Sequence, residues 1–151
     1  MRSEGSNNIS PIIVARRVRI ALILEALWML LKSDVLATFG YSTLCQQMNL
    51  GVAGNADPNA ENTIAEVAIA VHRASRCYPR SPACLQRSVA LASMLRKRGI
   101  AADLKIGVQQ IPFASHAWVE VAGRIINDVQ RVRDAYPPLH EFKAMPGKPR
   151  R

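Results

Sequence analysis

The hydrophobic period of this chain changes at Gly99. Before that glycine, apolar residues recur at steps of three and four, which is the period of amphipathic helices. The predicted helices are 11–33, 57–76 and 81–99. After it, Leu104, Ile106 and Val108 alternate with polar or small residues, which is the period of half-buried strands. The predicted strands are 104–108, 115–121 and 124–129. Helices followed by a meander of strands predict an α+β domain in which a helix packs on an antiparallel sheet.

The chain has the length of one domain with its own core. Its residues are 49% hydrophobic, which excludes wholesale disorder, and a domain of this size buries roughly 68–70% of its unfolded surface. It therefore needs no disulfide or metal for stability, and its three cysteines, an odd number, argue against a disulfide framework. We expect a helical region over 1–56, a core over 57–142 and a basic tail over 143–151.

The sequence has the features of a cytoplasmic protein. Its first ten residues are polar, with no apolar run behind a basic start, so they do not resemble a signal peptide. The longest apolar stretch, 20–31, is 12 residues long, whereas a membrane-spanning helix needs about 20 residues. We therefore expect a protein of the reducing cytoplasm that has no membrane-spanning helix.

The predicted helix 11–33 combines an apolar stripe with a basic start. The stripe consists of Ile13, Ile20, Leu24, Leu27 and Leu31. Arginines at 16, 17 and 19 oppose the helix dipole, which indicates that they serve something other than helix stability. We favour a helix whose stripe packs on its own domain. The alternative is a surface helix that binds an acidic partner or a membrane face.

Cys84 is the first candidate catalytic residue. Ser81-Pro82 is typical of a helix start and would place Cys84 at the third helical position. There, unpaired backbone N–H groups and the positive end of the dipole favour a thiolate. The same N–H groups can face the oxyanion of an acyl-transfer intermediate. The alternative is an inert buried cysteine, the commonest fate of a free thiol.

His116 is the second candidate, because a strand over 115–121 gives it a defined face. His116, Trp118 and Glu120 share one side of that strand, and the alternating apolar residues share the other. A lone histidine in a strand is more often structural than catalytic. The residue opposite His116 therefore decides between the two interpretations.

The turn after this strand sets the register of the hairpin. A two-residue turn at Ala122-Gly123 requires positive φ from an alanine, which is costly. We therefore expect a three-residue turn over 121–123 with the glycine left-handed. This register pairs Glu120 with Arg124, whose opposite charges favour it independently.

The same register places Asp128 directly opposite His116. Facing side chains of this kind have Cβ atoms about 4.5–5.5 Å apart. A carboxylate at that distance can fix the tautomer of the histidine and stabilise its protonated form, while the other ring nitrogen faces a cysteine. The predicted catalytic residues are Cys84, His116 and Asp128.

Several motifs resemble those of the lasso-peptide leader peptidases, transglutaminase-like cysteine proteases of bacterial ribosomal-peptide pathways. The motifs are Cys84-Leu85-x-Arg87-Ser88-x-Ala90-Leu91, LRKRGI at 95–100, LKIGV at 104–108, Pro112-Phe113, HAWVEV at 116–121, Asn127-Asp128 and Tyr136-Pro137-x-Leu139. The resemblance covers about residues 57–140. The order of Cys, His and Asp within this surrounding sequence is specific, whereas any one motif alone is weak.

The resemblance implies papain-like chemistry on a transglutaminase-like core. Cys84 matches the nucleophile of the family, His116 its general base and acid, and Asp128 the residue that orients the histidine. Such enzymes cleave the leader from a lasso precursor and use no cofactor. The implied partners are the precursor peptide, a separate leader-recognition protein and an asparagine-synthetase-like cyclase.

Three other functions remain open at this point. The same residues could catalyse transglutaminase-like acyl transfer, because a fold does not determine the acceptor. A metal site is a poor fit, because Cys77, Cys84, His72 and His116 lack paired ligand spacing.

The third alternative is a basic nucleic-acid-binding module, for which the net charge of +9 is the only support. The basic residues are scattered over 16–19, 73–80, 96–98, 131–133 and 143–151. They accompany neither a reading helix nor a set of stacking aromatics. We therefore expect no nucleic-acid partner. The positive charge is better explained by a surface that binds an acidic leader or its recognition protein.

Overall fold

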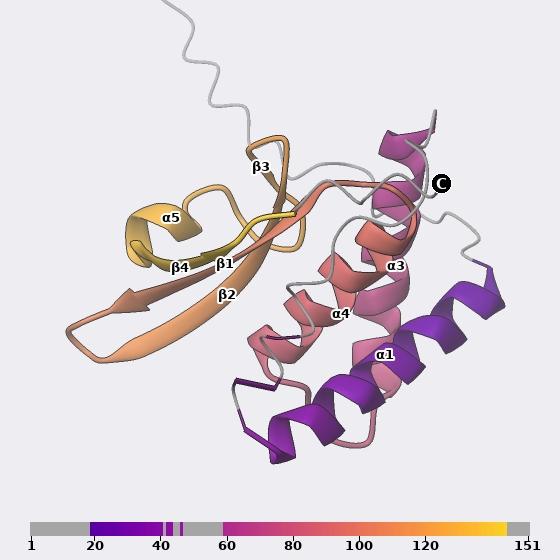
Figure 1. Ribbon diagram of the computed structural model, residues 1–151, viewed down its shortest axis with the longest axis horizontal. Helices are drawn as coiled ribbons and strands as arrows, with labels where there is room; N and C mark the ends of the chain where they lie inside the picture. Colours follow the sequence, from indigo (N-terminus) through magenta and orange to yellow (C-terminus); the bar gives the residue numbers. More distant parts are fainter. Residues whose placement is uncertain (1–18, 41, 44–45, 47–58, 145–151) are drawn as a thin grey trace, which may run out of the picture.

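The computed structural model describes residues 19–40, 42–43, 46 and 59–144, and it confirms the α+β class. Among these residues, three long helices precede a four-stranded antiparallel sheet whose strand order is β3-β2-β1-β4 (Figure 1), and a short helix lies between its last two strands in the sequence. The helices are α1 (Ile20–Thr38), α3 (Ala60–Cys77), α4 (Cys84–Lys97) and α5 (Val132–Ala135). The strands are β1 (Ala102–Gln109), β2 (Ala114–Val121), β3 (Arg124–Ile125) and β4 (Pro138–Phe142). No described helix is both long and apolar enough to cross a membrane.

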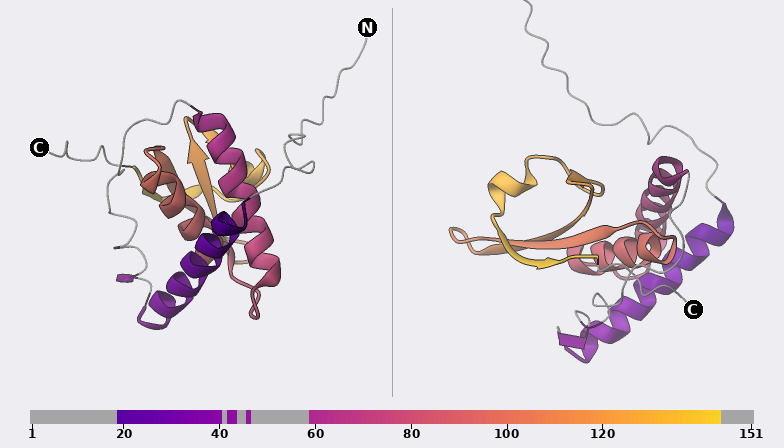
Figure 2. Two further views of the ribbon diagram at one scale, coloured as in Figure 1. Left: turned by 90° about the vertical axis from the view of Figure 1, so that its right-hand side faces the viewer. Right: turned by 45° about the horizontal axis from the view of Figure 1, so that its top comes forward.

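Helix α4 is the centre of the fold. It packs on β1 and β2 along one side and on α1 and α3 along the others (Figure 2). The five consecutive residues 88–92 are all buried, so every face of this helix is covered. Because α4 carries Cys84 at its first position, the most buried of the described helices holds the candidate nucleophile.

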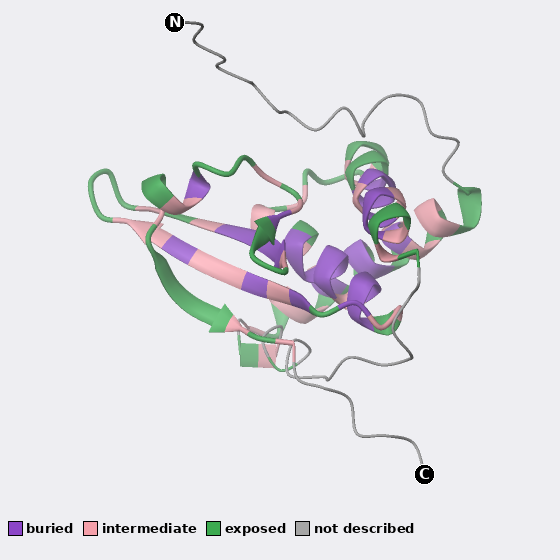
Figure 3. Cartoon of the chain, turned by 90° about the horizontal axis from the view of Figure 1, so that it is seen from above, coloured by how far each residue is buried: buried purple, intermediate pink, exposed green. Residues whose placement is uncertain are grey.

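The two faces of β2 belong to two separate clusters, as the alternation of its residues predicts. Ala117 and Val119 face the helices and join the main core, beside the buried residues of α4 (Figure 3). Trp118 faces the other way and packs with Ile125 and Val132 in a smaller cluster. The main cluster holds the sheet against α4, and the smaller one holds α5 against the outer face of the sheet.

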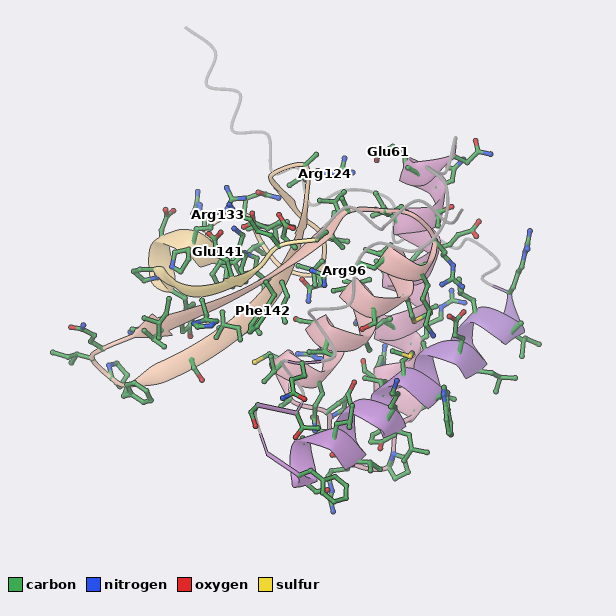
Figure 4. The ribbon with its side chains drawn as sticks, viewed as in Figure 1. Glu61, Arg96, Arg124, Arg133, Glu141 and Phe142 are labelled. Carbon is green, nitrogen blue, oxygen red and sulfur yellow. The ribbon has the colours of Figure 1, made fainter. Side chains whose placement is uncertain are left out.

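The end of α4 is anchored to two strands by one side chain. Arg96 is buried, and its guanidinium donates to the carbonyl oxygens of Ala102 (2.8 Å) and Phe142 (2.7 Å). Figure 4 labels Arg96 and Phe142. The predicted stop at Gly99 is confirmed, since this glycine has a φ of +76° immediately after the helix. The helix layer and the sheet are thereby joined at the point where the hydrophobic period changes.

The prediction of a three-residue turn between β2 and β3 is wrong. Val121 pairs with Arg124, so the turn has two residues, and Ala122 adopts a φ of +49°. Two-residue turns of this kind match the twist of the strands they join, which offsets the strain at the alanine. The expected Glu120–Arg124 pair does not form, because this register pairs Glu120 with Ile125. Arg124 instead binds Glu61 of α3 at 2.7 Å (Figure 4).

The face with which α1 packs also differs from the prediction. The buried residues of this helix are Ala26, Met29, Leu30 and Ser33. In contrast, Ile20, Leu24 and Leu31 of the predicted stripe are 75%, 59% and 45% exposed. The helix is apolar on two sides, so its sequence does not identify which side meets the core. The predicted beginning at residue 11 lies outside the described residues.

The observed limits of other helices and strands differ from the predicted ones. Helix α4 begins at Cys84 rather than at Ser81, and the third strand is only two residues long. Both α5 and β4 were missed, because their sequences are too short to show a hydrophobic period. The predicted helix start at Asp57-Pro58 lies outside the described residues.

Candidate active site

His116 and Asp128 are in direct contact. Oδ2 of Asp128 meets Nε2 of His116, and the two side chains are 25% and 24% exposed. A carboxylate in this position fixes the tautomer and the orientation of an imidazole ring. Nδ1 is the ring nitrogen that this contact leaves for proton exchange with another group.

The contact arises from a bend and not from the predicted cross-strand pairing. The pairing of β2 with β3 continues for one residue beyond β3, since the Ile126 N–H donates to the carbonyl oxygen of Val119 at 2.9 Å. The Val119 N–H then donates to Oδ1 of Asn127 at 2.8 Å, so a side chain replaces the next strand carbonyl. The backbone leaves the sheet there, which allows Asp128 to reach His116 from a bend.

Cys84 occupies the first turn of α4, where three backbone N–H groups have no partner within the helix. This turn is held by Gln86, whose Oε1 accepts from the Ala83 N–H at 2.6 Å. The Nε2 of the same side chain donates to Asp34 of α1 at 2.9 Å, and the Tyr78 hydroxyl donates to the other oxygen of Asp34. The N-terminal helix thus takes part in positioning the start of α4.

A buried network joins α4 to the strand that bears His116. Ser88 lies one turn beyond Cys84, and its hydroxyl donates to the carbonyl oxygen of Ala117 at 2.9 Å. The same Oγ accepts from Nδ2 of Asn127, also at 2.9 Å. Residues i and i+4 share a helix face, so Cys84 lies on the same side of α4 as Ser88, the side that meets β2.

The structure therefore brings together two of the three predicted site residues and places the third on α4, which is hydrogen-bonded to β2 and to Asn127 through Ser88. His116 contacts Asp128, whereas within the described part of the chain no hydrogen bond joins Cys84 to either of them. Sequence reasoning missed the bridging roles of Ser88 and Asn127. The only signal for them was their presence beside Cys84 and Asp128 in the family motifs.

One wall of the site depends on a glycine. Gly107 of β1 pairs with His116 of β2, and a Cβ at Gly107 would lie 2.4 Å from the carbonyl oxygen of Tyr136. The absence of a side chain there allows the segment after α5 to cross close over the sheet. The ring of Tyr136 consequently lies 5.3 Å from the ring of His116, measured between centroids.

An ion pair stabilises the outer face of β2 beside this wall. Oε1 of Glu120 accepts from Trp118 Nε1 and from Arg133 Nε, each at 2.8 Å, and Arg133 also binds the carbonyl oxygen of Gly123. Burial of Glu120 by itself raises its pKa, but the hydrogen bonds from Arg133 and Trp118 outweigh burial and hold the pKa below its usual value. The pair fixes α5, which leads into Tyr136.

The titratable side chains of the described residues offer no metal site. Among residues 19–40 and 59–144, no group of three His, Cys, Asp or Glu side chains is arranged to hold a metal ion. Cys77 is exposed at the last position of α3, the opposite helix end from that occupied by Cys84.

Two comparisons with known proteins point the same way. The family model described as the transglutaminase-like superfamily matches residues 26–141. The microcin J25-processing protein McjB of Escherichia coli is 53% identical over 59 residues, which are 39% of this chain and 28% of McjB. The match therefore spans less than a third of this curated relative. No solved structure matches the chain.

Proposed function

Because this chain belongs to the transglutaminase-like superfamily, we propose that it is a cysteine peptidase that removes the leader from a lasso-peptide precursor. The observation that carries the proposal is the His116–Asp128 contact, linked through Asn127 and Ser88 to the helix that begins at Cys84. The identity with a protein named for processing microcin J25 supports the substrate class. In this proposal residues 57–142 form the peptidase core.

The proposed reaction uses the three residues in separate roles. Nδ1 of His116 takes the proton of the Cys84 thiol, and the thiolate attacks the scissile carbonyl carbon. The N–H groups of the first turn of α4 stabilise the oxyanion that forms. His116 then donates its proton to the leaving amine, which is the new amino terminus of the core peptide. Asp128 orients the imidazole throughout.

The second half of the reaction releases the leader. Collapse of the first intermediate leaves the leader carbonyl joined to Cys84 as a thioester. Water loses a proton to Nδ1 of His116 and attacks this thioester, which frees the leader as a carboxylic acid and restores the thiol. An amine in place of water would give an amide, so the mass of the leader distinguishes hydrolysis from acyl transfer.

We place this reaction in the cytoplasm with two partners. A separate leader-recognition protein supplies affinity for the leader, and an asparagine-synthetase-like cyclase consumes the freed amino terminus. The net charge of +9 suits an acidic leader or an acidic face of the recognition protein. No cofactor takes part in the proposed chemistry.

The test is cleavage of precursor by the wild-type protein and by Cys84→Ala, each with the recognition protein and cyclase. Wild type should give free leader, and Cys84→Ala should leave the precursor intact. Cys77→Ala is the matched control, since it removes an exposed cysteine at the far end of another helix. Undiminished cleavage by Cys84→Ala would refute the assignment of the nucleophile.

A further inference from the structure

Helix α1 has an exposed apolar face that the proposed function does not use. Its large exposed side chains are Ile20, Leu24, Trp28, Leu31, Val35 and Phe39, which are 45% to 75% exposed. The opposite face packs on α3 and α4, so this face lies on the outer side of the helical layer (Figure 1). Monomeric proteins rarely expose a contiguous apolar patch larger than a few hundred Å². A helix that is apolar on both sides is therefore expected to be covered on both.

The spacing along this face is that of a helix–helix seam. The exposed residues at alternating steps of three and four are Ala21, Leu24, Trp28, Leu31, Val35 and Thr38. This is the a/d pattern of helices that pack side by side with knobs in holes. A narrow seam of this kind fits another helix better than the flat surface of a bilayer.

The ends of α1 indicate the direction of the second helix. The first turn holds no acidic residue, the last turn holds no basic residue, and Arg19 lies at the N-terminal end. The first and last turns of α1 therefore supply no charge of their own that compensates the helix dipole. An antiparallel helix brings the opposite pole to each end. If that helix is a second α1, each Arg19 lies beside the C-terminal end of the other helix, where a cation is favourable.

We propose that α1 packs antiparallel on α1 of a second copy of this chain, which makes a two-fold symmetric dimer. In this pairing Trp28 of one copy faces Leu31 of the other, and Leu24 faces Val35. An isologous seam of this kind is self-complementary, as a two-fold interface requires.

The charges beside the seam fit the same arrangement. Glu25 and Lys32 occupy equivalent flanking positions one heptad apart, so antiparallel packing brings Glu25 of each copy near Lys32 of the other, with an axial offset of about 3 Å. Parallel packing would instead place both Arg19 side chains at the same end of the pair and would give neither Glu25 nor Lys32 an opposite charge across the seam. Glu25 also binds Arg98 of its own chain at 2.5 Å, which holds the carboxylate in position.

The first test is the mass of the full chain in solution as a function of concentration. Light scattering should give about twice 16.6 kDa at high micromolar concentration, with a fall toward 16.6 kDa on dilution. Leu24→Glu and Leu31→Glu should abolish the dimer. Leu139→Glu is the matched control, because it changes an equally apolar residue that is 68% exposed on β4.

The second test determines the direction of the helices. Ala21 of one copy faces Thr38 of the other in the antiparallel dimer, whereas within one chain these residues lie about 25 Å apart along the helix. The double variant Ala21→Cys with Thr38→Cys should form an inter-chain disulfide under mild oxidation, and each single variant should match wild type. Cross-linking of the single variants would indicate parallel packing and overturn the proposal.

Tryptophan fluorescence reports dimer formation and also shows whether the variants remain folded. Trp28 is 63% exposed, whereas Trp118 is fully buried. Quenching of Trp28 by acrylamide should decrease as the dimer forms, and the emission of Trp118 reports that the seam variants remain folded. A chain that stays monomeric at every concentration overturns the proposal, whether or not it binds anionic vesicles or another protein. So does a dimer that Leu24→Glu leaves intact.

Discussion

Asp128 reaches His116 from a bend, and the bend begins where the side chain of Asn127 takes the place of a strand carbonyl. The pair therefore depends on the residue before Asp128 as well as on Asp128 itself. Asn127 also binds Ser88, one turn along the helix from Cys84. A single amide side chain thus connects the elements that carry all three candidate catalytic residues.

The first prediction concerns the carboxylate. Asp128→Asn should lower kcat for leader cleavage about ten-thousand-fold, because an amide no longer selects the reactive tautomer of His116. Asp134→Asn is the control, since it removes an exposed carboxylate on α5. Single-turnover cleavage of the precursor measures the effect. A loss no greater than that of the control would remove Asp128 from the proposed mechanism.

The second prediction separates the two hydrogen bonds of Asn127. Asn127→Ala leaves the Val119 N–H unpaired, so the free energy of unfolding should fall by about 1–3 kcal/mol. Asn127→Asp retains an acceptor for that N–H but loses the donor to Ser88. It should therefore recover most of the stability while cleavage remains slow. Urea denaturation and single-turnover rates provide the two readouts, and parallel recovery of both would argue against a positioning role for the Ser88 bond.

The third prediction concerns the reactivity of the thiols. Cys84 should be alkylated faster than Cys77 and Cys45 near neutral pH, because Cys84 lies at a helix N-terminus. Cys77 is the more exposed of the two described cysteines and lies at a helix C-terminus, so exposure alone predicts the opposite order. Mass mapping after brief treatment with iodoacetamide gives the rates. Equal labelling of the folded protein would show that Cys84 is not activated.

The fourth prediction concerns the wall beside His116. Gly107→Ala should displace the segment at Tyr136 and lower the free energy of unfolding by about 1–3 kcal/mol. The reason is that the new Cβ would meet a backbone oxygen and not a movable side chain. Cleavage should fall as well. Gly123→Ala is the comparison, since it strains a residue with a φ of +76° in open space. If that variant impairs cleavage as much as Gly107→Ala does, the contact with Tyr136 is not the cause.

The fifth prediction follows from the lowered pKa of Glu120. A carboxyl whose pKa is lower in the folded than in the unfolded state stabilises the protein above its unfolded pKa and loses this effect as the pH falls through its folded pKa. Glu120→Gln should therefore be less stable than wild type at neutral pH, with a difference that shrinks below the usual pKa of 4.5. Urea denaturation across this range measures it. A difference independent of pH would indicate that packing of Glu120 matters and its charge does not.

Local physics made much of the fold predictable. The change of period at Gly99 separates helices from strands because each backbone geometry has its own repeat. The glycine stop after α4 and the two faces of β2 follow from the same local geometry. The nearness of His116 and Asp128 was also predicted, although the register used to predict it was wrong.

The turn after β2 shows why register could not be predicted from local cost alone. Positive φ at Ala122 is unfavourable for that residue by itself, yet the structure contains it. Its neighbours gain partners that are distant in sequence: Arg124 binds Glu61, and Glu120 binds Arg133. These ion pairs form only in the folded domain, so the local sequence around the turn does not reveal them.

The amino-acid sequence by itself determined the longer helices and strands and the end of the helical half, and it predicted that His116 and Asp128 lie close together. Only the tertiary structure decided which face of α1 is buried and how Asp128 arrives at His116. The physical reason is that periodicity is a property of one segment, whereas burial depends on which surfaces meet. α1 offers two apolar faces, and the position of α3 and α4 selects the one around Met29 and leaves Trp28 to solvent.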